Sequence, residues 1–126
     1  MLFRAGLPLL LVLTGSSPMM AAAPSPERVE IILANFSFTP SRIHLHKGQP
    51  YLLHFVNQGS GGHNFAAKKF FEAAQISGAA PPKGAVELKK GESRDVSLVP
   101  AAGRYKVKCT HFLHSGFGMK GEIVVD

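Results

Sequence analysis

The chain is a succession of short segments that favour β-strands, with turn residues between them. Tyr51 to Val56 is a nearly continuous apolar run, and in Arg42 to His46 the apolar Ile43 and Leu45 alternate with polar residues. Successive side chains of a strand point to opposite faces, so this alternation gives one buried and one exposed face. Short strands at this spacing, with turn signals between them, are typical of a β-sandwich. We therefore predict an all-β sandwich of about seven or eight strands.

The strand boundaries follow from the same patterns, and one segment has a different character. Ala67 to Gln75 favours a short helix, whereas 57–62 and 78–84 are rich in Gly, Pro, Asn and Ser and should be loops. We expect strands at Val29 to Asn35, Arg42 to His46, Tyr51 to Val56, Ala85 to Leu88, Arg94 to Leu98, Gly103 to Lys108 and Gly121 to Val125.

The first 23 residues have the features of a secretory signal peptide. A short basic start, Met1 to Arg4, precedes the apolar run Leu7 to Leu13 and the small residues Ala21 to Ala23. The apolar run is far shorter than the roughly 20 residues that a membrane-spanning helix needs. We predict a cleaved signal peptide over residues 1–23, a folded domain over 24–126, export to the periplasm and no stable insertion in the membrane.

The predicted mature domain is basic. Without Arg4, the chain keeps 13 of its 14 Lys and Arg residues against 8 Asp and Glu residues, a formal charge of +5. Such a charge favours acidic partner surfaces or anionic membranes. Nucleic acid is excluded as a partner, because the basic residues are dispersed among strands and no motif combines them with stacking aromatic residues.

Cys109 is the only cysteine, so the domain has no intramolecular disulfide. A lone cysteine can be a small apolar core residue. In an oxidising compartment, however, an unpaired thiol needs protection, and a metal ion would hold it as a thiolate. The residues that follow Cys109 favour a metal-bound thiolate over a small apolar core residue.

Metal-binding side chains are concentrated just after that cysteine. Cys109, His111, His114 and Met119 lie within eleven residues, and His63 lies 46 residues upstream of Cys109. A thiolate, two imidazoles and a thioether are the ligands of a trigonal copper site with a weak axial Met. These residues fall at the ends of predicted strands, where loops let side chains converge. Either His111, by strand alternation from Cys109, or His114 can supply the second imidazole.

Four motifs together span the predicted mature chain: Phe38-x-Pro40-x-x-Ile43-x-Leu45-x-x-Gly48, His63-Asn64-Phe65, Gly103-x-Tyr105-x-x-x-Cys109 and Gly121-x-Ile123-Val124-Val125. These motifs resemble those of the cupredoxins. The resemblance implies a small Greek-key β-sandwich with one type 1 copper, held by His63, Cys109, His114 and Met119. His111 would then be either a neighbour of the ligands or a surface residue. The Cys-x₄-His-x₄-Met spacing is similar to that of rusticyanin and longer than the Cys-x₂-His-x₄-Met spacing of pseudoazurin and most plastocyanins.

Residues next to the ligands are candidates for supporting roles. Asn64 and Thr110 each follow a ligand directly, and the resemblance implies that they join the two ligand loops. Apolar residues of the 109–119 segment are candidates for a surface that contacts redox partners, and nearby lysines would steer an acidic partner towards it. The apolar candidates are Phe112, Leu113 and Phe117, and the basic ones are Lys68, Lys69 and Lys120.

These observations lead us to expect a monomeric blue copper protein, not an enzyme, that carries single electrons by Cu(I)/Cu(II) cycling. Its partners would be redox proteins such as a cytochrome or a copper oxidoreductase. The alternative is a periplasmic copper carrier or resistance protein with no electron-shuttle role, for which only the His44-x-His46 pair is a hint. That pair could hold a second metal, but no third ligand is evident. One short domain lacks the sets of His-x-His and His-Cys-His motifs of a multicopper oxidase.

Overall fold

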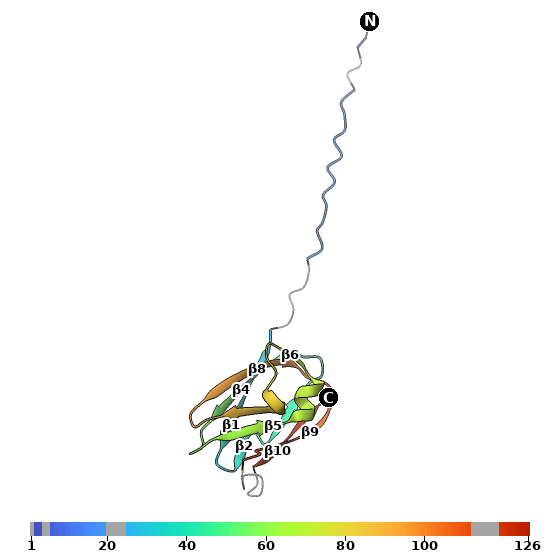
Figure 1. Cartoon of the computed structure of the whole chain (residues 1–126). Coiled ribbons are helices and arrows are strands. Elements are labelled where there is room, and N and C mark those ends of the chain that lie inside the picture. Colours follow the sequence, from blue (N-terminus) through green and yellow to red (C-terminus); the bar gives the residue numbers. More distant parts are fainter. Residues whose placement is uncertain (1, 4–5, 20–24, 112–118) are drawn as a thin grey trace.

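The computed structural model describes residues 2–3, 6–19, 25–111 and 119–126, and its folded part is a sandwich of two five-stranded β-sheets (Figure 1). One short α-helix, α1 (Lys68–Ala73), and one 3₁₀ turn, η1 (Pro82–Gly84), are the helical elements of this described part. The all-β sandwich predicted from the sequence is thus confirmed. Its strands are β1 (Glu27–Ala34), β2 (Ser37–Thr39), β3 (Arg42–Leu45), β4 (Tyr51–Asn57), β5 (His63–Ala66), β6 (Gln75–Ser77), β7 (Ala85–Leu88), β8 (Ser93–Val99), β9 (Gly103–Lys108) and β10 (Lys120–Val125).

The first sheet has the strand order β2-β1-β4-β8-β6 and the second the order β3-β10-β9-β5-β7. Two pairs are parallel, β1 with β4 and β3 with β10, and the other pairs are antiparallel. The second sheet places β9 between β10 and β5. Three strands that are separated in the sequence therefore present neighbouring ends at one end of the sandwich.

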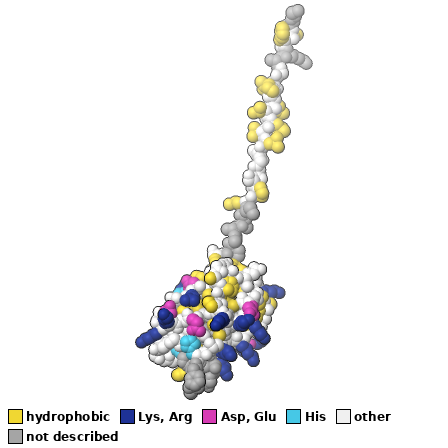
Figure 2. All heavy atoms as spheres, in the orientation of Figure 1, with side chains coloured by type: hydrophobic (Ala, Val, Ile, Leu, Met, Phe, Trp, Pro, Cys, Tyr) yellow, Lys and Arg dark blue, Asp and Glu magenta, His cyan; other side chains and the backbone are white. Residues whose placement is uncertain are grey.

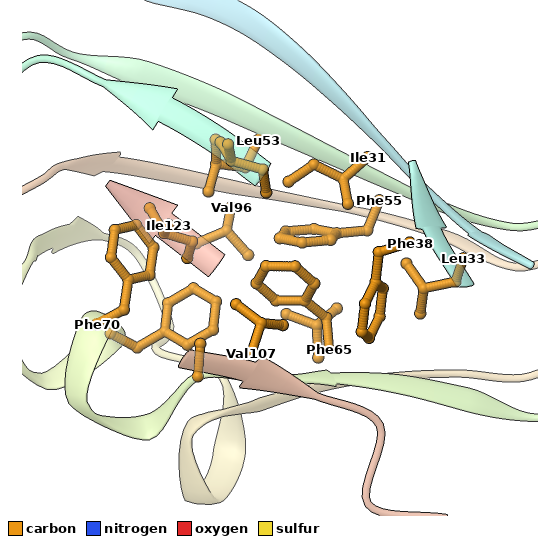
Figure 3. Close-up of a cluster of buried hydrophobic side chains, with 14 of the residues drawn as sticks. Ile31, Leu33, Phe38, Leu53, Phe55, Phe65, Phe70, Val96, Val107 and Ile123 are labelled. Carbon is orange, nitrogen blue, oxygen red and sulfur yellow. The ribbon is translucent and has the colours of Figure 1, made fainter. Parts of the chain in front are cut away.

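The core lies between the sheets and is centred on aromatic residues (Figure 3). Along β4, alternate residues are buried, as expected for a strand with one face on the core. The ring of Phe65, from β5, lies 4.9 Å from that of Phe55 and 5.4 Å from that of Phe38, centroid to centroid. Aromatic pairs of this kind contribute about 0.5–1.5 kcal/mol beyond their buried area. Phe65 therefore anchors β5 in the core two residues after His63.

Several predicted boundaries agree with the structure and others differ. The strands β7 and β9 have the predicted bounds, and α1 lies inside the predicted helical segment. Three strands were not predicted: β2, β5 and β6, which have only three or four residues each. As a result His63, expected at the edge of a loop, is the first residue of β5. The described part of the chain contains no helix that is long and apolar enough to span a bilayer.

Candidate metal centre

Cys109 and Met119 lie next to each other because two strands end there. The antiparallel ladder between β9 and β10 pairs Lys108 with Lys120, so Cys109 and Met119 occupy the next position. The backbone N–H of Cys109 donates to the carbonyl oxygen of Met119 at 3.1 Å. Both side chains are fully buried. The pairing of β9 with β10 thus brings a thiol and a thioether together in the interior.

His63 approaches the same point from β5. The residue is 2% exposed, and its Nδ1 lies 4.0 Å from the Sγ of Cys109. In zinc sites, which use the same ligand types, bonds to Cys sulfur are about 2.3 Å long and bonds to His nitrogen about 2.0 Å. The separation of the two atoms is therefore short enough for one metal ion to bond to both. The buried donor set of thiolate, imidazole and thioether fits copper, which accepts soft sulfur ligands together with imidazole.

The other nitrogen of His63 fixes the orientation of the ring. His63 Nε2 lies 3.2 Å from the Oδ1 of Asn35, which follows β1 directly. When Nε2 carries the proton and donates it to Asn35, the lone pair of Nδ1 points to the side of Cys109. Metal-binding imidazoles are usually oriented by such a second hydrogen bond.

A glycine makes room for this arrangement. A Cβ added to Gly59 would lie 2.5 Å from His63 Nε2 and 2.8 Å from Asn35 Oδ1, so a larger residue would displace the imidazole. The loop is held in place by the buried side chain of Asn57. Its Nδ2 donates to the carbonyl of Gly61 at 2.9 Å, and its Oδ1 accepts the N–H of Gly59 at 2.9 Å. The sequence predicted a polar, glycine-rich loop here, but no role was assigned to Asn57, Gly59 or Gly61.

Asn64 and Thr110 join the two segments that carry the buried imidazole and thiol. Ala66 pairs with Lys108 in the antiparallel ladder, so Asn64 lies at the level of Thr110. The N–H of Thr110 donates to Asn64 Oδ1 at 2.8 Å, and Asn64 Nδ2 donates to Thr110 Oγ1 at 2.6 Å. The backbone N–H of Asn64 also points to Cys109 Sγ at 3.5 Å. The structure therefore brings together the two residues named as supports.

Glu87 extends this network, although no sequence motif points to this residue. Asn64 Nδ2 donates to Glu87 Oε1 at 2.6 Å, and His111 Nε2 lies 2.9 Å from Glu87 Oε2. Partial burial raises the pKa of Glu87, but the hydrogen bonds with His111 and Asn64 and the charge of His111 outweigh it. The pKa of this carboxyl is therefore lower than usual. His111 lies beside the centre, with its ring centroid 6.4 Å from that of His63.

Four of the predicted site residues lie outside the described residues: His114, Phe112, Leu113 and Phe117. The second imidazole therefore remains a prediction. Among residues 25–111 and 119–126, no group of three or more His, Cys, Asp or Glu side chains is arranged to hold a metal ion. The predicted basic residues are all exposed. Lys68 and Lys69 open α1, with Lys68 ion-paired to Glu72, and Lys120 opens β10.

The remaining histidines are engaged with carboxylates. His44 Nε2 and His46 Nδ1 lie 2.9 Å and 3.1 Å from the two carboxylate oxygens of Asp126. The hydrogen bond with His44, supported by the bond with His46 and by the charge of both rings, lowers the pKa of Asp126. The side chain of His54 is 19% exposed and bonds to Asp95.

Comparison with known proteins agrees with this geometry. A family model described as a cupredoxin-like domain matches residues 6–125. No curated protein sequence matches the chain. Among solved structures, the dithionite-reduced auracyanin of Roseiflexus castenholzii is 22% identical, with a TM-score of 0.60, over 82% of this chain and 99% of that one. Auracyanin B is 25% identical, with a TM-score of 0.60, over 83% and 93% of the two chains.

Two further structures show the range of proteins that share the fold. Auracyanin A of Chloroflexus aurantiacus, described as a "blue" copper protein, is 23% identical over 81% of this chain and all of that one, with a TM-score of 0.57. A multicopper oxidase of Campylobacter jejuni is 13% identical over 86% of this chain and 32% of the oxidase, with a TM-score of 0.60. The family match covers nearly the whole sequence, and the chain belongs to the cupredoxin-like domain family.

Proposed function

We propose that this protein is a type 1 copper protein that carries single electrons between redox partners. The observation that supports this most strongly is the buried Cys109 thiol, with His63 Nδ1 4.0 Å from its sulfur and Met119 hydrogen-bonded through the backbone. Copper bound by these residues would supply a one-electron Cu(I)/Cu(II) couple. The auracyanins of similar fold, one of them described as a blue copper protein, support the same function.

The chain's own residues would contribute in three ways. His63, Cys109 and His114 would be the strong ligands and Met119 the weak axial one. Ligands fixed at the ends of β5, β9 and β10 move little, which suits a centre that accepts and releases an electron with little rearrangement. Burial keeps water from the sulfur, and the N–H of Asn64, aimed at Cys109 Sγ, would withdraw charge from the thiolate.

The proposal also states where the protein acts and which proteins it contacts. Residues 1–23 would be removed during export, and residues 24–126 would act as a monomer in the periplasm. The apolar residues Phe112, Leu113 and Phe117, which are near His114 in the sequence, would contact a cytochrome or a copper oxidoreductase. The resemblance to a multicopper oxidase does not favour catalysis, because this chain matches only 32% of that enzyme.

A redox titration distinguishes an electron carrier from a copper carrier. The copper-loaded mature protein should give one reversible electron per chain, and a Cu(I) chelator should fail to extract the metal after reduction. Met119→Leu should retain copper and change the potential, because it alters only the weak axial ligand. Loss of copper on reduction, or the absence of a reversible couple, would show that the protein delivers copper instead.

A further inference from the structure

A groove of about 920 Å³ runs along β9 and is bordered by α1, η1 and the start of β10. The exposed side chains of β9 are all basic: Arg104, Lys106 and Lys108 alternate with Tyr105 and Val107, which turn towards the interior. Figure 2 shows several Lys and Arg side chains on the side of the domain where Figure 1 labels β9. One whole face of a strand therefore contributes positive charge to the groove.

The opposite border of the groove is also basic. Lys68 and Lys69 from α1 and Lys83 from η1 line it. Gly84 brings these two elements together: its φ is +71°, and a Cβ there would lie 2.4 Å from the Cα of Lys68. Its carbonyl accepts the N–H of Ala67 at 2.9 Å. Among the described residues that line the groove, none is acidic.

Most of the basic residues that line the groove make no ion pair within the described part of the chain, although Lys106 lies opposite Glu122 in the ladder of β9 and β10. Lys68 pairs with Glu72, and Arg104 shares Glu122 with Arg42. The other lysines of the groove make no ion pair within the described part of the chain. They are Lys69, Lys83, Lys106, Lys108 and Lys120.

Two of these lysines face each other across neighbouring strands, an arrangement that lowers the stability of the fold. Lys108 lies directly opposite Lys120 in the antiparallel ladder of β9 and β10. Like charges in such cross-strand pairs destabilise a sheet. An anionic partner that covers both ammonium groups would relieve this repulsion.

The groove ends at residues that adjoin the candidate metal centre. Lys108, Thr110 and Lys120 all line it, and they adjoin Cys109 and Met119 in the chain. A molecule bound in the groove would thus lie against residues next to two of the proposed copper ligands. A planar anionic membrane would reach only the border of such a concave surface, whereas a protruding protein segment can enter it.

We propose that this groove, here called the basic groove, docks an acidic segment of the redox partner protein and holds it beside the Cys109 and Met119 end of the sandwich. This inference rests on the proposed electron-carrier function. Electrostatic attraction at such a surface mainly accelerates the encounter of the two proteins and sets their orientation.

The test compares two single substitutions, Lys106→Glu and Lys47→Glu, which change the charge by the same amount. Lys106 lies in the basic groove, whereas Lys47 lies in the turn after β3, near Asp126 and far from Lys120 along β10. Poly-L-glutamate is titrated into the copper-loaded mature protein and binding is followed by NMR chemical shifts. We expect shifts on β9, α1 and the start of β10. Affinity should fall about tenfold in Lys106→Glu and change little in Lys47→Glu.

Three other outcomes would overturn the proposal: equal weakening in both variants, shifts confined to other surfaces, or binding only to vesicles of phosphatidylcholine and phosphatidylserine. The last result would assign the surface to a membrane. Stopped-flow oxidation of the reduced protein by hexacyanoferrate(III) gives a second readout, which Lys106→Glu should slow more than Lys47→Glu. Because poly-L-glutamate binding needs no electron transfer, a missing copper couple would refute the proposed function without affecting this titration.

Discussion

The imidazole of His63 has its two nitrogens in different surroundings. Nδ1 lies 4.0 Å from Cys109 Sγ, and Nε2 lies 3.2 Å from Asn35 Oδ1. When Nε2 carries the proton and donates it to Asn35 Oδ1, Nδ1 keeps a lone pair that can bind a metal. Asn35 was not predicted from the sequence because it meets His63 through the packing of the turn after β1 against the loop before β5.

Replacing Asn35 tests this orientation. Asn35→Ala removes the acceptor for Nε2, so the ring can rotate or change tautomer, and copper affinity should fall about 10–100-fold. Asn35→Asp keeps an acceptor oxygen at the same place and serves as the control, with affinity close to that of the unchanged protein. Competition with a chelator measures both values. An unchanged affinity in Asn35→Ala would show that His63 needs no such support.

Asn64 is expected to affect the potential as well as the affinity. Asn64→Ala removes the side-chain bonds to Thr110 and Glu87, so β5 and the Cys109 segment lose their side-chain links and keep the backbone contacts of Ala66 with Lys108 and of Asn64 with Cys109. The potential should shift and copper should dissociate faster, as protein-film voltammetry and metal-release kinetics would record. A potential and a release rate equal to those of the unchanged protein would contradict the role assigned to Asn64.

At the scale of elements, strands with clear alternation were predictable and strands without it were not. The bounds of β7 and β9 followed from their patterns, and the ends of β9 and β10 placed Cys109 and Met119 correctly at a strand boundary. The strands β2 and β6 were missed because three residues give no periodic signal, and β5 was missed because its residues do not alternate between apolar and polar. Glu87 was missed because its role depends on β7 lying beside β5, which spacing along the chain does not reveal.

The pairing of β9 with β10 allows a prediction about stability. Lys120→Gln removes the repulsion with Lys108, so the free energy of unfolding should rise by about 0.2–1 kcal/mol. Lys106→Gln is the matched control, since Lys106 lies opposite Glu122 and its loss should not stabilise the sheet. Urea unfolding of the metal-free proteins measures both. A lower stability in Lys120→Gln would show that this pair is not repulsive.

For the molecule as a whole, the charge distribution predicts how association responds to salt. The predicted mature chain has a formal charge of +5, and the basic groove concentrates positive groups beside the candidate centre. Exposed charges are screened beyond about 10 Å at 0.1 M salt. The rate of oxidation by anionic hexacyanoferrate(III) should therefore fall as salt rises, while cationic tris(phenanthroline)cobalt(III) should show the opposite trend. Equal salt dependence for both oxidants would contradict steering by this surface.

The central claim, that Cys109 binds copper as a thiolate in a blue site, is tested most directly by the visible absorption spectrum of residues 24–126 after addition of one equivalent of Cu(II). A short copper–thiolate bond gives an intense charge-transfer band in the visible range. We predict that the band appears, that ascorbate bleaches it and that Cys109→Ser abolishes it. Copper binding without such a band, or an unchanged band in Cys109→Ser, would contradict the account.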